Sequence, residues 1–387
     1  MSTESTVLTG SPRIAWWKAL LLIVPIAAWA GLLTLQPADE LIWSIGGWIS
    51  WLVFVGLFFL ILVSGRTNRY RSILFILIAV LMPVNFIAGM LERHGTMALN
   101  QADFLDAGAA FCPLALPMLI VPAAFTRTVI FPSVLLGTSG IIGMSAMLLA
   151  SSLATGRGWC SWGCFYGGWD ELFSRLPKKP LIKKIDRRWI YLPFGVLLAV
   201  VLTSAFTLSI TYCEWLCPFK VLTEFAAPTS PLIIVQTVLF VLAFVGLVVV
   251  LPLLTKRRVQ CALFCPLGAL QSLWNKINIF EVRIDREMCG DCSRCIRECP
   301  TLSLDEKSLQ TGTASITCTR CGKCIDVCTK GAISYHVKGT RLGVKPNVAR
   351  VLFLYPSWII MAMLGAGIVQ SGIWRILRLV TTGSMLR

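Results

Sequence analysis

The stretch that decides the fold is Cys289-Gly-Asp-Cys-Ser-Arg-Cys-Ile-Arg-Glu-Cys-Pro300, and its spacing returns in Cys318-Thr-Arg-Cys-Gly-Lys-Cys-Ile-Asp-Val-Cys328. In each run three cysteines are separated by two residues, and a fourth follows after three more. Three closely spaced thiolates can hold three corners of one cubane from a single loop, while the fourth, displaced onto a helix, can reach a second cluster. The spacing therefore predicts two interlocked iron–sulfur clusters.

The eight cysteines divide into two sets if the fourth cysteine of each run binds the other cluster. We therefore predict one [4Fe-4S] centre at Cys289, Cys292, Cys295 and Cys328, and a second at Cys318, Cys321, Cys324 and Cys299. Two zinc sites are the alternative, but zinc usually takes two C-x2-C pairs rather than two runs of four cysteines. The pattern is typical of bacterial two-cluster ferredoxins. From 281 to 340 the apolar density falls, and nine basic residues nearly balance eight acidic ones. We expect an α+β ferredoxin domain there.

The rest of the chain has the composition of a membrane protein. Of its 387 residues, 56% are hydrophobic and only 14% are charged. Runs of about 20 apolar residues, each able to cross a hydrocarbon core roughly 30 Å thick, recur along the chain. The clear runs are 14–35, 41–63, 72–91, 133–154, 189–211, 232–254 and 351–373. We predict a polytopic α-helical membrane protein of about seven or eight spans, with the ferredoxin domain inserted before the last one.

Prolines indicate whether the eighth apolar segment spans the membrane, and loop charges indicate the orientation of the chain. Segment 107–131 is apolar, but four prolines in or beside it remove backbone donors that lipid cannot replace, so we favour a re-entrant or broken piece over a span. Basic loops after the second span and at 155–189 are expected in the cytoplasm. An N-in start then places the loop at 212–231 outside and the ferredoxin domain inside. Arg375 and Arg378 would lie outside, against the usual bias.

Four regions result from this division. They are an N-terminal transmembrane region at 1–155, a transmembrane core at 156–280, the ferredoxin domain at 281–340, and a C-terminal helix and tail at 341–387.

Charge and histidine content exclude two classes of function. The net charge of +16 is explained first by cytoplasmic loops of a membrane protein, so nucleic acid is not an expected partner. The only histidines are His94 and His336, and there is no C-x-x-C-H, so neither paired haem ligands nor a c-type attachment site is present. If the chain carries electrons, iron and sulfur must carry them, and we expect no haem.

Three further cysteine pairs share the spacing C-x3-C. They are Cys160 and Cys164, Cys213 and Cys217, and Cys261 and Cys265. On a helix, positions i and i+4 lie on one face with Cβ atoms about 5–6 Å apart, which is too far for an undistorted disulfide. Two such thiolates can instead hold a metal or half a cluster. Burial as small hydrophobic side chains is the alternative.

The predicted topology separates these pairs. The first and third pairs would lie at the cytoplasmic surface and could supply four thiolates to one centre, whereas Cys213 and Cys217 would lie outside. Cys112, beside Pro113, would share that external side, and three external thiolates near His94 could form a further metal site.

At these residues the chain resembles a known family. Arg157-Gly-Trp-Cys-Ser-Trp-Gly-Cys164, Glu214-Trp-Leu-Cys-Pro218 and Cys261-Ala-Leu-Phe-Cys-Pro-Leu-Gly-Ala-Leu270 precede the two-cluster ferredoxin. This order is similar to that of the polyferredoxin-type membrane proteins of anaerobic respiration, including the membrane quinol-dehydrogenase subunit of periplasmic nitrate reductase and the membrane half of the nitrous-oxide reductase regulator. Phe165 replaces the proline after the first pair, and the first 150 residues and the last span are additional.

The resemblance implies a multi-pass protein of the bacterial inner membrane. Its expected role is to pass electrons between quinol or a cytoplasmic donor and a periplasmic respiratory partner, as an electron-transfer subunit or quinol dehydrogenase component working with other membrane subunits. The alternative is a maturation factor that uses thiol or copper chemistry on a respiratory metalloenzyme, since soft thiolates suit Cu(I).

Overall fold

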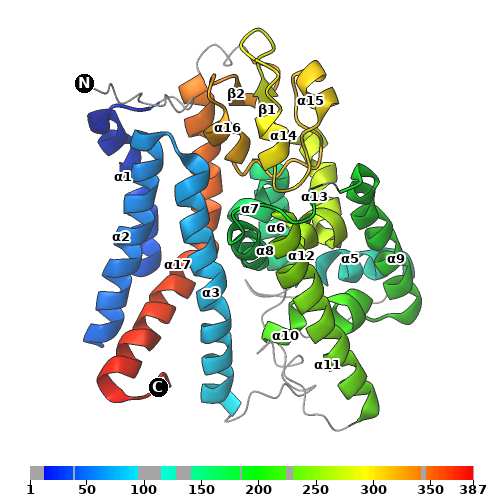
Figure 1. Cartoon of the computed structure of the whole chain (residues 1–387). Coiled ribbons are helices and arrows are strands. Elements are labelled where there is room, and N and C mark those ends of the chain that lie inside the picture. The colour runs from blue at the N-terminus through cyan, green and yellow to red at the C-terminus, as the bar shows by residue number, and fades with distance from the viewer. Residues whose placement is uncertain are drawn as a thin grey trace.

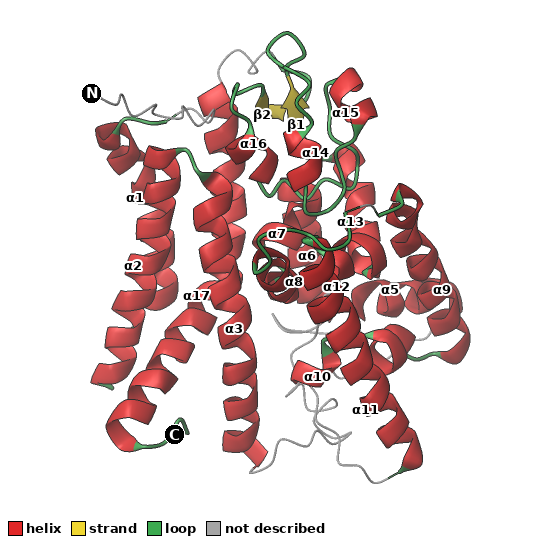
Figure 2. Cartoon of the chain, in the orientation of Figure 1, coloured by secondary structure: helices red, strands yellow, loops and turns green. Residues whose placement is uncertain are grey.

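A computed structural model describes residues 13–37, 40–94, 115–127, 141–183, 185–223, 230–340 and 346–386. Two groups of helices stand side by side, and a small layer containing both strands covers one end of them (Figures 1 and 2). The loop between α2 and α3 lies at this covered end. The predicted basic loop after the second span and the predicted ferredoxin segment therefore lie at the same end of the molecule.

Six helices of the described residues are long and apolar enough to cross a membrane. They correspond to six of the seven clear apolar runs, and their bounds are Trp16–Thr34, Leu41–Ser64, Thr67–Glu92, Arg187–Thr207, Pro231–Thr255 and Asn347–Thr382. The predicted run at 133–154 appears only as the shorter helix α6 (Ile141–Thr155), and segment 107–131 only as α5 (Leu116–Thr126), because the rest of both lies outside the described residues. The mainly helical membrane architecture is thus supported, with six candidate spans.

The first group of helices joins the two ends of the chain. It comprises α1 (Trp16–Thr34), α2 (Leu41–Ser64), α3 (Thr67–His94) and α17 (Pro346–Thr382). Side chains bond across it to backbone carbonyls, for example Ser50 Oγ to Ala366 O at 3.2 Å and Asn85 Nδ2 to Ile368 O at 2.8 Å. Such interhelical hydrogen bonds join helices where lipid provides no hydrophobic drive. The N-terminal region and the last span therefore form one structural unit.

Ion pairs at the uncovered end of this group involve Arg375 and Arg378, the two arginines predicted to lie outside against the positive-inside bias. Both guanidinium nitrogens of Arg375 bond to Glu92, at 2.9 and 3.0 Å. Arg378 lies 3.9 Å from Glu40. Glu92 and Glu40 thus pair with the two arginines of the last span.

The second group contains the segments that carry the C-x3-C pairs. Its elements are η3 (Gly156–Gly158), α7 (Trp159–Trp162), α8 (Phe165–Arg175), η4 (Arg187–Tyr191), α9 (Leu192–Thr207), η5 (Tyr212–Leu216), α10 (Lys220–Thr223), α11 (Pro231–Ala243), η6 (Phe244–Val250), α12 (Leu251–Thr255), η7 (Gln260–Phe264) and α13 (Pro266–Ile277), together with α5 and α6. Helix α8 packs against α3 and thereby joins the two groups.

The junction of α3 and α8 depends on a glycine. A Cβ added at Gly168 would lie 2.5 Å from Ala79 Cβ and 2.6 Å from the carbonyl oxygen of Phe75. Gly168→Ala is therefore expected to force the helices apart and to destabilise the protein by about 1–3 kcal/mol, the usual cost of overpacking. The measurement is the thermal midpoint in detergent. Gly56→Ala is the control, because a Cβ there meets nothing within 4 Å. Equal midpoints for Gly168→Ala and the parent would show that α8 is not held this closely.

The covering layer is built on a two-stranded antiparallel sheet. Strand β1 (Phe280–Ile284) pairs with β2 (Ile333–Val337), with Phe280 opposite Val337 and Ile284 opposite Ile333. Between them lie α14 (Arg294–Glu298), α15 (Glu306–Thr311) and α16 (Lys323–Val327). Phe353 of α17 stacks on Tyr335 with ring centroids 4.5 Å apart and meets Phe280 edge-on. The sheet is therefore packed directly onto the last helix.

Candidate iron–sulfur site

The outermost group of cysteines lines a cavity. Cys289, Cys292, Cys295 and Cys328 all contribute to its wall. Asp291 and Ser293 have left-handed backbone conformations, which allow the loop between the first three cysteines to curl. Cys295 then begins the first turn of α14, and Cys328 follows α16. The wall of this cavity therefore includes all four cysteines that the spacing assigns to one centre.

The second group lies deeper. Electrostatic contacts join Cys318, Cys321, Cys324 and Cys299 to one another. Burial raises the pKa of the Cys318 thiol to about 12, and the neighbouring Cys299 thiol adds to the shift. Cys324 is also in electrostatic contact with Cys295, which belongs to the outer group. The two groups are thus adjacent, because α14 and α16 each contain a cysteine of one group and are followed directly by a cysteine of the other.

The structure also brings the first and third C-x3-C pairs together. The Cys265 thiol is influenced by those of Cys160 and Cys164, and Cys261 by Cys265 and Cys160. Burial raises the pKa of Cys164 to about 12, with the Cys160 thiol next in importance. Cys164 and Cys265 occupy the same position in their segments, immediately before α8 and α13. We call these four residues the inner cysteine group.

Two buried arginines clasp the inner cysteine group reciprocally. Arg157, three residues before Cys160, donates from Nη2 to the carbonyl of Cys261 at 2.9 Å. Arg258, three residues before Cys261, donates from Nη2 to the carbonyl of Cys160 at 2.7 Å. Each arginine thus holds the loop of the opposite pair, and the two halves are related by approximate two-fold symmetry.

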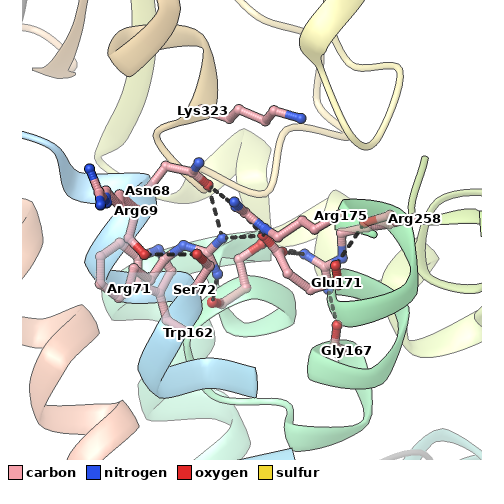
Figure 3. Close-up of polar contacts among 12 residues, drawn as sticks. Asn68, Arg69, Arg71, Ser72, Trp162, Gly167, Glu171, Arg175, Arg258 and Lys323 are labelled. Carbon is pink, nitrogen blue, oxygen red and sulfur yellow. Dashed lines mark hydrogen bonds and ion pairs between the residues drawn. The ribbon is translucent and has the colours of Figure 1, made fainter. Parts of the chain in front are cut away.

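A buried ion-pair network links this clasp to α3 (Figure 3). Arg71 Nη2 lies 2.8 Å from Glu171 Oε1, and Arg258 Nη1 lies 3.4 Å from Glu171 Oε2. Burial alone would raise the pKa of Glu171, but the guanidinium groups of Arg71, Arg175 and Arg258 hold it below its usual range. Glu171 is therefore an anion within the protein.

The same network reaches the second cysteine group. After burial, the charge of Arg71 has the largest influence on the pKa of Cys321. Arg157 Nη1 donates to the carbonyl of Thr317, the residue before Cys318, at 3.0 Å. The second group and the inner group therefore share their arginine neighbours.

The second C-x3-C pair lies close to the inner cysteine group through Tyr212. Tyr212 is fully buried, its hydroxyl accepts a hydrogen bond from Gln260 Nε2 at 3.1 Å, and it is in electrostatic contact with Cys217, Cys265 and Cys213. The position of Cys213 and Cys217 on the outer face stays a prediction. The chain turns at Leu208, and Thr211 folds back along α9 to bond the carbonyl of Val200 at 3.3 Å. This reversal brings Tyr212 and the pair close to Cys265.

The remaining candidates are not part of these groups. Cys112 lies outside the described residues, so the proposed external site is not tested. His94 ends α3. His336 lies in β2 beside Glu281. In the described part of the chain, no three His, Cys, Asp or Glu side chains are close enough to hold a single metal ion.

The arginine clasp was missed in the sequence, although a signal is present. The first and third pairs share the pattern Arg-x2-Cys-x3-Cys, whereas Ile210 stands at the arginine position of the second pair. This difference distinguishes the two pairs that form the inner cysteine group from the second pair, which lies beside Tyr212.

Comparison with known protein families finds three matching segments, one around each C-x3-C pair. Segments 136–184, 189–233 and 237–286 each match a family described as a 4Fe-4S binding domain. Each segment contains one C-x3-C pair, which begins 24 residues after the segment's start. The match therefore covers the three C-x3-C pairs rather than the two ferredoxin-type runs.

The fold and the repeated cysteine pairs resemble those of polyferredoxin-type membrane iron–sulfur proteins, as the sequence predicted. The chain is 25% identical to the putative electron transport protein YccM of Escherichia coli, over 58% of this chain and 64% of that protein. It is 23% identical to the ferredoxin-type protein NapH of Haemophilus influenzae, over 51% and 68%. It is 31% identical to the regulatory protein NosR of Pseudomonas aeruginosa, over 39% of this chain but only 21% of NosR. No solved structure matches the chain. The chain is thus similar to proteins that are named for electron transport and for ferredoxin-type sequence.

Proposed function

We propose that this protein carries electrons through the membrane. The donor would bind at the end covered by β1, β2, α14, α15 and α16, which we call the ferredoxin-like layer, and the acceptor would lie on the other side. The observation that carries this proposal is the row of cysteine groups. It runs from the open cavity, through the second group, to the inner cysteine group, with Cys213 and Cys217 one side chain further, beyond Tyr212. The hydrocarbon core is roughly 30 Å thick, which is too wide for a single electron-tunnelling step. A conduit therefore requires redox centres at intermediate depth.

The residues present fit [4Fe-4S] clusters. Four cysteines contribute to the wall of the outer cavity, and in the second group a backbone N–H, that of Ser303, points at Cys299 Sγ at 3.3 Å. Hydrogen bonds to the sulfurs are a normal feature of such sites. We propose that residues 281–340 form a two-cluster ferredoxin domain. Bound there, the clusters would supply one-electron carriers.

The inner cysteine group fits a third cluster. The buried thiols of Cys160 and Cys261 and the partly buried thiols of Cys164 and Cys265 lie beside two buried guanidinium groups. No ion pair of the described residues includes Arg157. A buried charge is costly unless it is compensated. An anionic cluster bound by the four cysteines would compensate it. The match of these segments to a 4Fe-4S binding domain supports the same assignment.

The loop charges support an orientation, and the family resemblance suggests the partners. The basic loop between α2 and α3 lies at the end that carries the ferredoxin-like layer (Figure 1). By the positive-inside bias this end would face the cytoplasm of a bacterial inner membrane. We propose quinol or a cytoplasmic redox protein as the donor and a periplasmic respiratory protein as the acceptor, with further membrane subunits between them.

Iron and acid-labile sulfide per chain test the proposal directly. Anaerobically purified protein in detergent is expected to contain about twelve of each, because each of three cubane clusters brings four. A value of about eight would confine clusters to the ferredoxin-like layer. The C-x3-C pairs would then be thiol or metal-handling motifs, and the maturation role would replace the conduit.

A further inference from the structure

The two arginines of the clasp are placed to act on the electronic properties of the inner cysteine group. Arg258 is completely buried, and besides holding the carbonyl of Cys160 its Nη2 lies 3.4 Å from Cys261 Sγ. Arg157 is 1% exposed and acts electrostatically on Cys160. Neither charge is screened by solvent, so both act at nearly full strength on whatever the four thiols bind.

Two buried carboxylates oppose them at close range: Asp170, whose Oδ2 accepts from the backbone N–H of Cys261 at 2.9 Å, and Glu171. Glu171 lies 3.4 Å from Arg258 and is 2% exposed. It contacts Arg258 from α8, an element that does not supply a cysteine side chain to the group. Removal of its charge therefore changes the local field without changing a ligand.

The second C-x3-C pair and the outer cavity lack such buried arginines within the described ranges and can be compared with the inner cysteine group. At the second C-x3-C pair, Ile210 replaces the arginine. Around the outer cavity the basic residues Arg294 and Lys330 are exposed, so water and salt screen them. Of these three places, only the inner cysteine group has buried arginines beside its thiols among the residues the structure describes, whereas the second group also has Arg71 and Arg320 near Cys321 and Cys318.

We propose that Arg258 and Arg157 are positioning residues that raise the reduction potential of the cluster held by the inner cysteine group, and that Glu171 partly offsets them. Net charge and hydrogen bonds to the sulfurs set the potential of such clusters, and a nearby cation favours the more negative, reduced state. The inference rests on the proposed third cluster. It adds that this cluster is reduced more readily than its thiolates alone would allow.

The test is a redox titration followed by electron paramagnetic resonance on the whole protein in detergent. The signal of the inner group is identified as the one absent from Cys160→Ser/Cys265→Ser protein. Arg258→Gln is expected to lower its midpoint, changing the reduction equilibrium about tenfold, which is about 59 mV for a one-electron couple. Arg258→Lys should retain most of the parent value. Glu171→Gln should move the midpoint the opposite way, because it removes an opposing anion.

The opposite shifts separate an electrostatic role from a structural one. General loosening of the site would move both variants in the same direction and would overturn the inference, as would unchanged midpoints at full iron content. If Arg258→Gln loses its cluster, the upward shift of Glu171→Gln remains decisive. Arg283→Gln, at an exposed position on β1, is the control and should shift nothing. Iron of about eight per chain in the parent would instead refute the third cluster itself, and the inference with it.

Discussion

Cys160→Ser/Cys265→Ser protein is expected to contain about four fewer irons per chain than the parent, because one cubane loses two of its four ligands. These cysteines come from different segments and meet only through the fold. The double variant therefore removes one cysteine ligand from each of the two segments and leaves the ferredoxin-type cysteines in place. Iron and sulfide analysis after anaerobic purification measures the loss.

The second C-x3-C pair gives the matched control. Cys213→Ser/Cys217→Ser alters the same spacing in the segment that lacks the arginine, so the iron content should stay near the parent value. Both proteins should still accept electrons into the ferredoxin-like layer from dithionite. The first should also lose nearly all delivery to an acceptor on the other side of a proteoliposome membrane. Equal iron in both variants would show that the inner cysteine group holds no cluster.

Arg71→Ala is expected to lower the free energy of unfolding by about 3 kcal/mol. Breaking a buried ion pair usually costs about 3–5 kcal/mol, and the lower end applies because Arg175 and Arg258 still face Glu171. Arg71 also donates to the carbonyl of Ser161 at 2.7 Å, so α3 and α7 lose a bond as well. Chemical denaturation in mixed micelles measures the difference.

An exposed ion pair provides the comparison. Arg283→Ala removes a 3.1 Å contact to Glu281, but the Arg283 side chain is 52% exposed, and such pairs contribute about 0–1 kcal/mol. If Arg71→Ala were as mild as Arg283→Ala, the buried network would not be holding α3, α7 and α8 together.

Spacing alone was enough to predict which cysteines come together in the ferredoxin-type runs, because short loops and helices leave few ways for thiols separated by two or three residues to converge. Apolar length likewise predicted six spans within one or two turns at most ends, α3 and α17 being longer than expected. These features depend on local geometry and hydropathy.

The proximity of Cys213 and Cys217 to the inner cysteine group could not be predicted in this way. Hydropathy marks the end of α9 but carries no information on the chain direction after it, which is set by Leu208 and by the bond from Thr211 to Val200. The buried arginines were missed for a related reason. In a membrane protein a basic residue next to a span is first explained as a cytoplasmic anchor, and only tertiary structure shows that Arg71 and Arg258 lie inside.

The length of α17 has a consequence for the donor. Its 37 residues extend about 55 Å at 1.5 Å each, whereas the hydrocarbon core is roughly 30 Å thick. If its far end, with Arg375 and Arg378, lies at the opposite membrane surface, the excess length projects on the near side, where Phe353 holds the sheet. The outer cavity would then stand clear of the lipid headgroups. A bulky soluble protein could approach it from the side without touching the bilayer.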